Sequence, residues 1–217
     1  MSSEHETACL IEQLAGDLQP VRRLRAPAVR ALVWLLGVAV VAGVAIARFA
    51  NPAVITGRLA VPQVAVQCLA IAVTGVAAIF AAFQLSVPGR SRHWVWLPVP
   101  SLAVWLAASG LGCLRYGWSL GGPGGIIGES SHCFAFIAAV SVPLAGGLFW
   151  MLSRARPIAP LPVALLGTLG VAAIAAFLLQ FFHPFDVTAI DLGLHLAAVA
   201  LVMGVGTALR RPLLAAG

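Results

Sequence analysis

Two short segments of the sequence gather side chains that can bind metals or react with oxidants. The first, residues 129–137, reads ESSHCFAFI and places Glu129, His132 and Cys133 directly before an apolar run. A carboxylate, an imidazole and a thiol are all metal ligands, and a thiol can also form a disulfide. Polar residues before an apolar run are also typical of ordinary loops and helix caps. Metal binding, redox sensing and plain loop chemistry therefore all remain open.

The second segment, residues 181–191, reads FFHPFDVTAID and contributes His183 and Asp186. Cys113 lies at the end of another apolar run. Thiolate and imidazole suit zinc or copper, with carboxylates as harder ligands. No CxxC or HxxxH spacing is present, and His132 and Cys133 are adjacent, so these two do not easily bind one ion. The spacing alone indicates a metal site only weakly.

Six apolar stretches would position these residues, and each can cross a bilayer, which takes about 20 helical residues. Of the 217 residues, 61% are hydrophobic and 9% are charged, against about 25% charged in a soluble domain. The stretches also lack the polar stripes of a soluble bundle. We expect an all-α integral membrane protein with six transmembrane helices and a short N-terminal cytoplasmic amphipathic helix. The stretches cover residues 30–48, 62–86, 94–114, 133–153, 159–182 and 190–209.

The arginines predict the orientation of these helices. The net charge is +6, and all 13 basic residues are arginine. Because cytoplasmic loops carry the excess of basic residues, both termini are predicted to be cytoplasmic and both chemical segments to face outward. The predicted divisions are a head at 1–29, a transmembrane domain at 30–209 and a tail at 210–217. The cytoplasmic arginines would be Arg22, Arg23, Arg25, Arg30, Arg90, Arg92, Arg154, Arg156, Arg210 and Arg211.

The head contains an amphipathic pattern. Leu10, Ile11, Leu14 and Leu18 share one face of a helix, with Thr7 as the predicted N-cap. Such a helix can lie on lipid or in a groove of a partner protein. Surface helices usually carry basic residues on the polar face, whereas this one is acidic until Arg22. The acidic face favours the protein groove.

A known family shares this opening. The segment LIEQLAGDLQPVRRLRAPAVRALVWL, residues 10–35, resembles the start of the NrsF-type negative regulators of extracytoplasmic-function sigma factors. The family's layout of a short cytoplasmic head followed by six spans is similar to the whole chain. The resemblance implies an anti-sigma factor, not an enzyme, in the bacterial inner membrane. Its head would hold a sigma factor until an outside redox or heavy-metal signal releases it.

The resemblance also implies partners and partner-binding residues. The partners would be an extracytoplasmic-function sigma factor and the lipid bilayer, with no direct contact to nucleic acid. No resident cofactor is expected, only a transiently bound heavy metal. The partner-binding residues would be Leu10, Ile11, Leu14, Leu18, Asp17, Arg22 and Arg23.

The outward sensor departs from the family pattern at one position. The sequence HCF looks like the site of the family's first cysteine, which falls on Cys133, while His183 before Pro184 replaces the second cysteine. We therefore favour metal ligation by Cys133 and His183, with Asp186, over a disulfide between Cys133 and Cys113. The predicted sensing residues are Cys133, His132, His183, Asp186, Glu129 and Cys113.

Two other classes of membrane protein fit less well. A haem or quinone oxidoreductase subunit needs two imidazoles at similar depth on facing helices, and only His195 is predicted to lie inside a span. A small transporter would need ionisable residues near the bilayer midplane, and the stretches show none. No nucleophile–base–acid set indicates a hydrolase.

Overall fold

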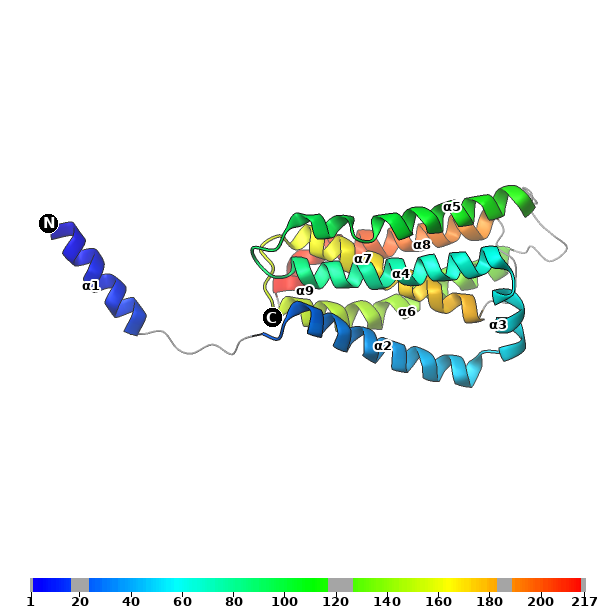
Figure 1. Cartoon of the computed structure of the whole chain (residues 1–217), viewed down its shortest axis with the longest axis horizontal. Helices are drawn as coiled ribbons and strands as arrows, with labels where there is room; N and C mark the ends of the chain where they lie inside the picture. Colours follow the sequence, from blue (N-terminus) through cyan, green and yellow to red (C-terminus); the bar gives the residue numbers. More distant parts are fainter. Residues whose placement is uncertain (1, 17–23, 117–126, 183–188, 216–217) are drawn as a thin grey trace.

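The computed structural model describes residues 2–16, 24–116, 127–182 and 189–215, and all regular elements in these ranges are helical (Figure 1). The order is α1 (Ser2–Gly16), α2 (Pro27–Phe49), α3 (Pro52–Leu59), α4 (Pro62–Leu85), the 3-10 helix η1 (Arg92–Trp96), α5 (Val99–Tyr116), α6 (Ile127–Ser153), α7 (Pro160–Phe182), α8 (Ala189–Ala208) and α9 (Arg210–Ala215).

The six predicted apolar stretches each coincide with a long helix: α2, α4, α5, α6, α7 and α8. Within the described residues, four segments are long and apolar enough to cross a membrane, namely Pro27–Phe49, Pro62–Leu85, Phe134–Ser153 and Pro160–Phe182. A fifth, Leu196–Ala208, is apolar but shorter. The all-helical, membrane-type character is confirmed. By length and apolar composition, the described residues support four spans, and the count of six stays a prediction.

Proline marks where several helices begin. Pro27, Pro52, Pro62 and Pro160 are each the first residue of a helix, where the missing N–H group would have had no helical partner. One predicted stretch begins differently, because residues 92–96 form η1 and α5 starts only at Val99. Pro98 lies between the two and cannot donate the backbone hydrogen bond that a continuous helix requires.

α7 is the central helix of the bundle and is buried along most of its length. It packs most extensively on α4, and the contact is reciprocal. A Cβ atom added at Gly170 of α7 would lie 2.7 Å from Ile79 Cδ1, and one added at Gly75 of α4 would lie 2.8 Å from Ile174 Cγ1. An isoleucine of each helix therefore covers a glycine of the other. Small residues at such contacts let membrane helices approach closely, so that dispersion forces hold them together.

Hydrogen bonds between side chains link α4 to α5. Gln67 Nε2 donates to Ser109 Oγ at 2.9 Å, and Thr74 Oγ1 donates to Ser101 Oγ at 3.0 Å. Thr74 and Ser109 are buried. Polar pairs of this kind join helices in an apolar environment, where an unpartnered hydroxyl or amide would be unfavourable.

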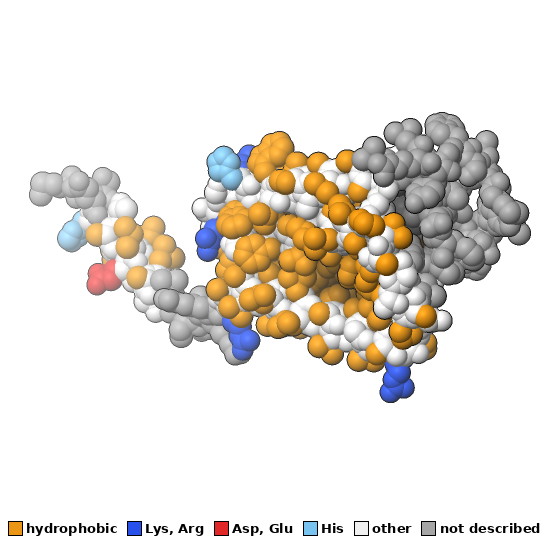
Figure 2. Space-filling view, turned by 45° about the vertical axis from the view of Figure 1, so that its right-hand side comes forward, with side chains coloured by type: hydrophobic (Ala, Val, Ile, Leu, Met, Phe, Trp, Pro, Cys, Tyr) orange, Lys and Arg blue, Asp and Glu red, His pale blue; other side chains and the backbone are white. Residues whose placement is uncertain are grey.

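The surface of the bundle is apolar. Large hydrophobic side chains such as Leu36, Val41, Leu69 and Val142 are exposed, and Figure 2 shows hydrophobic side chains spread over the bundle face with blue arginines near its ends. A soluble monomer rarely exposes so much contiguous apolar surface. This surface suits contact with lipid chains.

Candidate regulatory sites: the head and the α2 anchor

The N-terminal helix α1 presents an uncovered apolar face. Leu10, Ile11 and Leu14 are 56%, 61% and 61% exposed, and α1 is drawn away from the bundle in Figure 1. The amphipathic helix is thus confirmed, but the predicted N-cap at Thr7 is wrong because α1 begins at Ser2. The helix thus extends upstream of Thr7. The predicted partner residues Asp17, Leu18, Arg22 and Arg23 lie outside the described residues.

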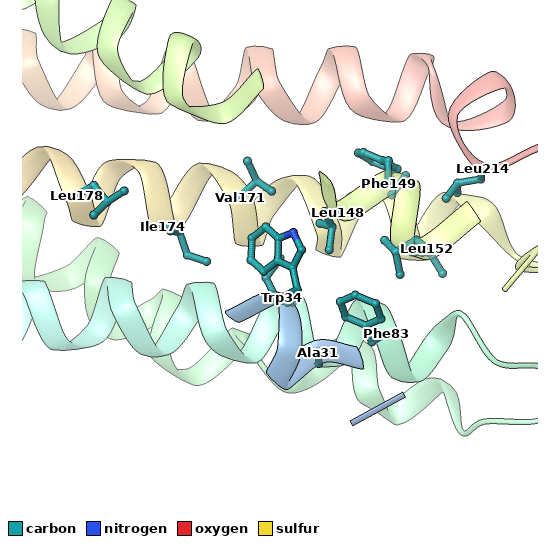
Figure 3. Packing of buried hydrophobic residues seen from close by; sticks show 13 residues of the cluster. Ala31, Trp34, Phe83, Leu148, Phe149, Leu152, Val171, Ile174, Leu178 and Leu214 are labelled. Atoms are coloured by element: carbon teal, nitrogen blue, oxygen red, sulfur yellow. The ribbon is translucent and has the colours of Figure 1, made fainter. Parts of the chain in front are cut away.

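The next helix, α2, is fully buried only along its first two turns, while Leu35, Val38, Ala42 and Ile46 further along it pack partly buried against the core. Pro27, Arg30, Ala31 and Trp34 are buried and share one helical face. Ala31 and Trp34 belong to the largest core cluster, in which Figure 3 shows Trp34 among residues of α6 and α7. Residues further along α2, such as Val41, are exposed, and α2 diverges from the other helices (Figure 1). The first two turns therefore form the most deeply buried part of the attachment of the head to the bundle.

Arg30 is the polar centre of this attachment, which we call the α2 anchor and define as Pro27, Arg30, Ala31 and Trp34. Its Nη2 atom donates a hydrogen bond to the backbone carbonyl of Met151 in α6. Its guanidinium lies 5.2 Å from the ring centroid of Phe83 in α4, a favourable cation–π distance. The Nη1 atom is buried without a hydrogen-bond partner. Arg30 thereby joins α2 to both α4 and α6.

The hydrogen bond from Arg30 gives a partner to one of the last backbone carbonyls of α6. The last four residues of α6 each offer a carbonyl, and these groups have few partners inside a helix. Trp150 accepts from Ser153 Oγ at 3.0 Å, and Met151 accepts from Arg30. Leu152 and Ser153 accept from the backbone N–H groups of Ala155 and Arg156 at 3.0 and 2.9 Å. A cation at a helix C-terminus is also favoured by the helix dipole, so the α2 anchor is matched electrostatically to α6.

The predicted sensing residues lie at the other end of the same helix. Positions 129, 132 and 133 fall in the first two turns of α6, which begins at Ile127. The predicted apolar stretch 133–153 agrees with the candidate span Phe134–Ser153, and the helix itself extends upstream of that span to Ile127. Position 113 lies in the last turn of α5. The side chains of these four residues, and the whole of His183 and Asp186, lie outside the described part of the chain.

The metal prediction is not tested by the described residues. Within them, no group of three or more His, Cys, Asp or Glu side chains could hold a metal ion, but the predicted ligands are not among those side chains. The two described cysteines are thiols rather than disulfides: Cys9 is exposed on α1 and Cys68 is buried in α4.

Comparison with known protein families decides the class of this protein. The family model NrsF, described as a negative regulator of sigma F, matches residues 14–215. The chain belongs to the NrsF family. The match covers nearly the whole chain, so the resemblance read from residues 10–35 is confirmed, and the protein is a negative regulator of a sigma factor by family. Comparisons with curated proteins and with solved structures find no match.

The NrsF match covers some of the candidate site residues and not others. It includes α2 and the whole bundle, together with Leu14, but it starts after Leu10 and Ile11. The role of these two residues therefore rests on their exposure. Sequence reasoning missed the α2 anchor, since it read Arg30 only as a topology signal. The signal was present: Arg30 and Trp34 are one helical turn apart in an otherwise apolar stretch.

Proposed function

We propose that this NrsF-family protein is a membrane-bound anti-sigma factor of the bacterial inner membrane, with six spans and both termini cytoplasmic. Its N-terminal helix sequesters an extracytoplasmic-function sigma factor until an outward redox or heavy-metal signal releases it. The observation that carries the proposal is the exposed face of Leu10, Ile11 and Leu14 on a helix tethered to an apolar bundle. An amphipathic helix of this kind binds by placing its apolar face in a groove of the partner.

The decisive experiment is co-purification of the sigma factor with the detergent-solubilised protein from its own cells. Deletion of residues 1–25 should abolish capture. Leu14→Asp places a charge in the centre of the apolar face and should weaken capture by more than about 30-fold, equivalent to a hot spot of about 2 kcal/mol. Glu12→Ala is the matched control, because Glu12 lies on the opposite face of α1 and is also exposed.

Normal capture by a Leu14→Asp variant that reaches the membrane would contradict this assignment of the binding face. Capture by the deletion variant would place the binding surface on the bundle instead.

The signal is proposed to travel along α6. This helix carries the predicted sensing positions near its start and the carbonyl of Met151, which accepts from Arg30, near its end. Its 27 residues span about 40 Å at 1.5 Å per residue. A metal or disulfide bond formed at the outward end would favour one of two packings of α6 by its differential affinity for them. A change at Met151 then alters the α2 anchor and the presentation of the head.

The sensing chemistry is proposed to be metal ligation by Cys133 and His183, with Asp186, His132 and Glu129 nearby in the sequence. The competing chemistry is a disulfide between Cys133 and Cys113. Replacing a thiol by imidazole at position 183 keeps a metal ligand but removes a disulfide partner. The outer compartment also permits oxidation, so both chemistries need a direct test.

Three variants separate the two chemistries when sigma release is measured after metal addition. Metal sensing predicts that Cys133→Ser and His183→Ala lose the response while Cys113→Ser keeps it. A disulfide predicts that Cys133→Ser and Cys113→Ser fail while His183→Ala responds. A normal response from all three would remove this outward cluster from the mechanism.

A further inference from the structure

A pocket at one end of the bundle is lined by three arginines. It has a volume of about 570 Å³ and is formed by Arg156, Pro157 and Pro160 between α6 and α7, and by Arg210, Arg211 and Leu214 of α9. Leu214 is buried in the largest core cluster, so the wall that α9 provides is fixed to the bundle. The pocket therefore combines cationic side chains with an apolar floor.

Acidic residues are absent from the sequence segments that carry these arginines. The ranges 18–128, 130–185 and 192–217 contain neither Asp nor Glu. Glu129 is at the start of α6, 24 residues before Ser153, or about 36 Å along the helix. Along the described chain, no Asp or Glu therefore lies next to the pocket's arginines in sequence.

Arg156 adopts an unusual backbone conformation in this pocket. Its φ angle is 44°, and it is the only non-glycine residue with positive φ among the described residues. Its N–H closes the end of α6 on the carbonyl of Ser153 at 2.9 Å, a position after a helix end where glycine is usual. An L-residue in this region is disfavoured by roughly 1–2 kcal/mol. Glycine would adopt this conformation without that cost.

The pocket lies where helices end, at the depth of lipid headgroups if the apolar helices span a membrane. Ile158 and Leu161, which neighbour its lining residues in sequence, are exposed apolar side chains. Basic pockets at the cytoplasmic ends of membrane helices suit anionic headgroups. We propose that this pocket binds the phosphate of an anionic phospholipid, with the arginines on the phosphate and the prolines and Leu214 against the glycerol backbone. The proposal rests on the membrane location, not on sigma binding.

The test is native mass spectrometry of the full chain in detergent, titrated with phosphatidylglycerol or with phosphatidylcholine of the same acyl chains. Arg156→Gly and Arg211→Ala should each weaken phosphatidylglycerol binding by about fivefold, because a basic residue near anionic lipid contributes about 1 kcal/mol. Phosphatidylcholine binding should not change. Arg92→Ala is the matched control, an exposed arginine of η1 outside the pocket.

Arg156→Gly also separates binding from folding. Glycine accepts positive φ without strain, so the lipid-free thermal midpoint of this variant should stay equal or rise while lipid binding falls. A lowered midpoint together with lost binding would make the role of Arg156 structural and overturn the proposal. An equal loss of binding in Arg92→Ala would reduce the effect to general surface charge and overturn it as well.

Two further measurements identify which anion binds in the pocket. If inorganic phosphate competes with phosphatidylglycerol at equal concentration, the ligand is a soluble anion and the lipid proposal fails. If deletion of residues 1–16 removes the dependence on Arg156 and Arg211, the acidic head occupies the pocket and the proposal also fails. Recovery of the chain in the soluble fraction would instead refute the membrane location itself.

Discussion

At the residue scale, Arg30 of the α2 anchor joins helices, a role that does not follow from the number of arginines on each side of the membrane. Arg30 donates to the Met151 carbonyl and stacks on Phe83, so its replacement affects three helices together. A second arginine, Arg154, lies 4.1 Å from the Trp150 ring centroid on the exposed surface. The two contacts have similar chemistry, but only the buried one joins separate helices.

Replacing Arg30 by alanine should lower the free energy of unfolding in detergent by about 1.5–3 kcal/mol, the range for a hydrogen bond to a charged group. Thermal unfolding measures the change, with Arg25→Ala as an exposed control. Arg30→Met separates the contributions, since it restores most of the volume without the donor. A methionine variant as stable as the parent would mean that packing, and not the hydrogen bond, holds α2.

The role of Arg30 could not be predicted from the sequence because its partner lies 121 residues away. Local patterns show that an arginine begins an apolar helix, but they do not show which carbonyl it meets. The exposed face of α1 was predictable, since spacing along one helix fixes which residues share a face. Arg156 was read as a topology signal, and its positive φ has no mark in the sequence.

At the element scale, the α4–α7 contact sets the spacing of the central helices. The reciprocal placement of Ile79 over Gly170 and Ile174 over Gly75 requires glycine at both positions. The backbone N of Ile79 would also lie 3.0 Å from a Cβ atom at position 170. A side chain there cannot be accommodated by rotating Ile79 alone, so the two helices must separate.

Gly170→Ala should therefore destabilise the bundle by about 1–3 kcal/mol, as overpacking of a core does. Gly43→Ala is the matched control, because a Cβ atom at Gly43 of α2 meets nothing within 4 Å. Alanine is the better helix former, so the control should be neutral or slightly stabilised. Equal thermal midpoints for both variants would refute the close approach.

Long helices were predictable and short ones were not. Apolar length located α2, α4 and α7 within a few residues. The short helices α3, η1 and α9 were not predictable, since helices this short form through tertiary packing rather than through their own propensity. α9 illustrates this, because Leu214 is buried against the bundle. The predicted tail at 210–217 thus contains a packed element.

At the scale of the whole molecule, most of the bundle's charged residues are arginines, and several of them meet at one end. Arg30 meets the end of α6, and Arg156 shares a pocket with Arg210 and Arg211. These contacts bring the start of α2, the α6–α7 connection and α9 to the same end of the bundle. A bundle in which distant basic segments meet at one end fits a single cytoplasmic face.

Reporter fusions test this arrangement directly. A fusion at residue 217 should report the cytoplasm, and one inserted in the loop at 118–128 should report the opposite side, because the arginines bias one end of every helix inward. Both reporters on the same side of the membrane would exclude a six-span topology with cytoplasmic termini. Moving Arg154 and Arg156 to that loop should weaken the preference for either side.

The distance between Arg30 and Met151 along the chain also sets an order of events during synthesis. At about 5–20 residues per second, the ribosome adds the 121 residues between them in roughly 6–24 s. Throughout that interval the head and the start of α2 are already made, while the carbonyl that anchors them has not been translated. Under the proposed function, the head of a newly made chain would therefore be able to meet a sigma factor before its anchor to α6 can form, so capture would precede control in the life of each molecule.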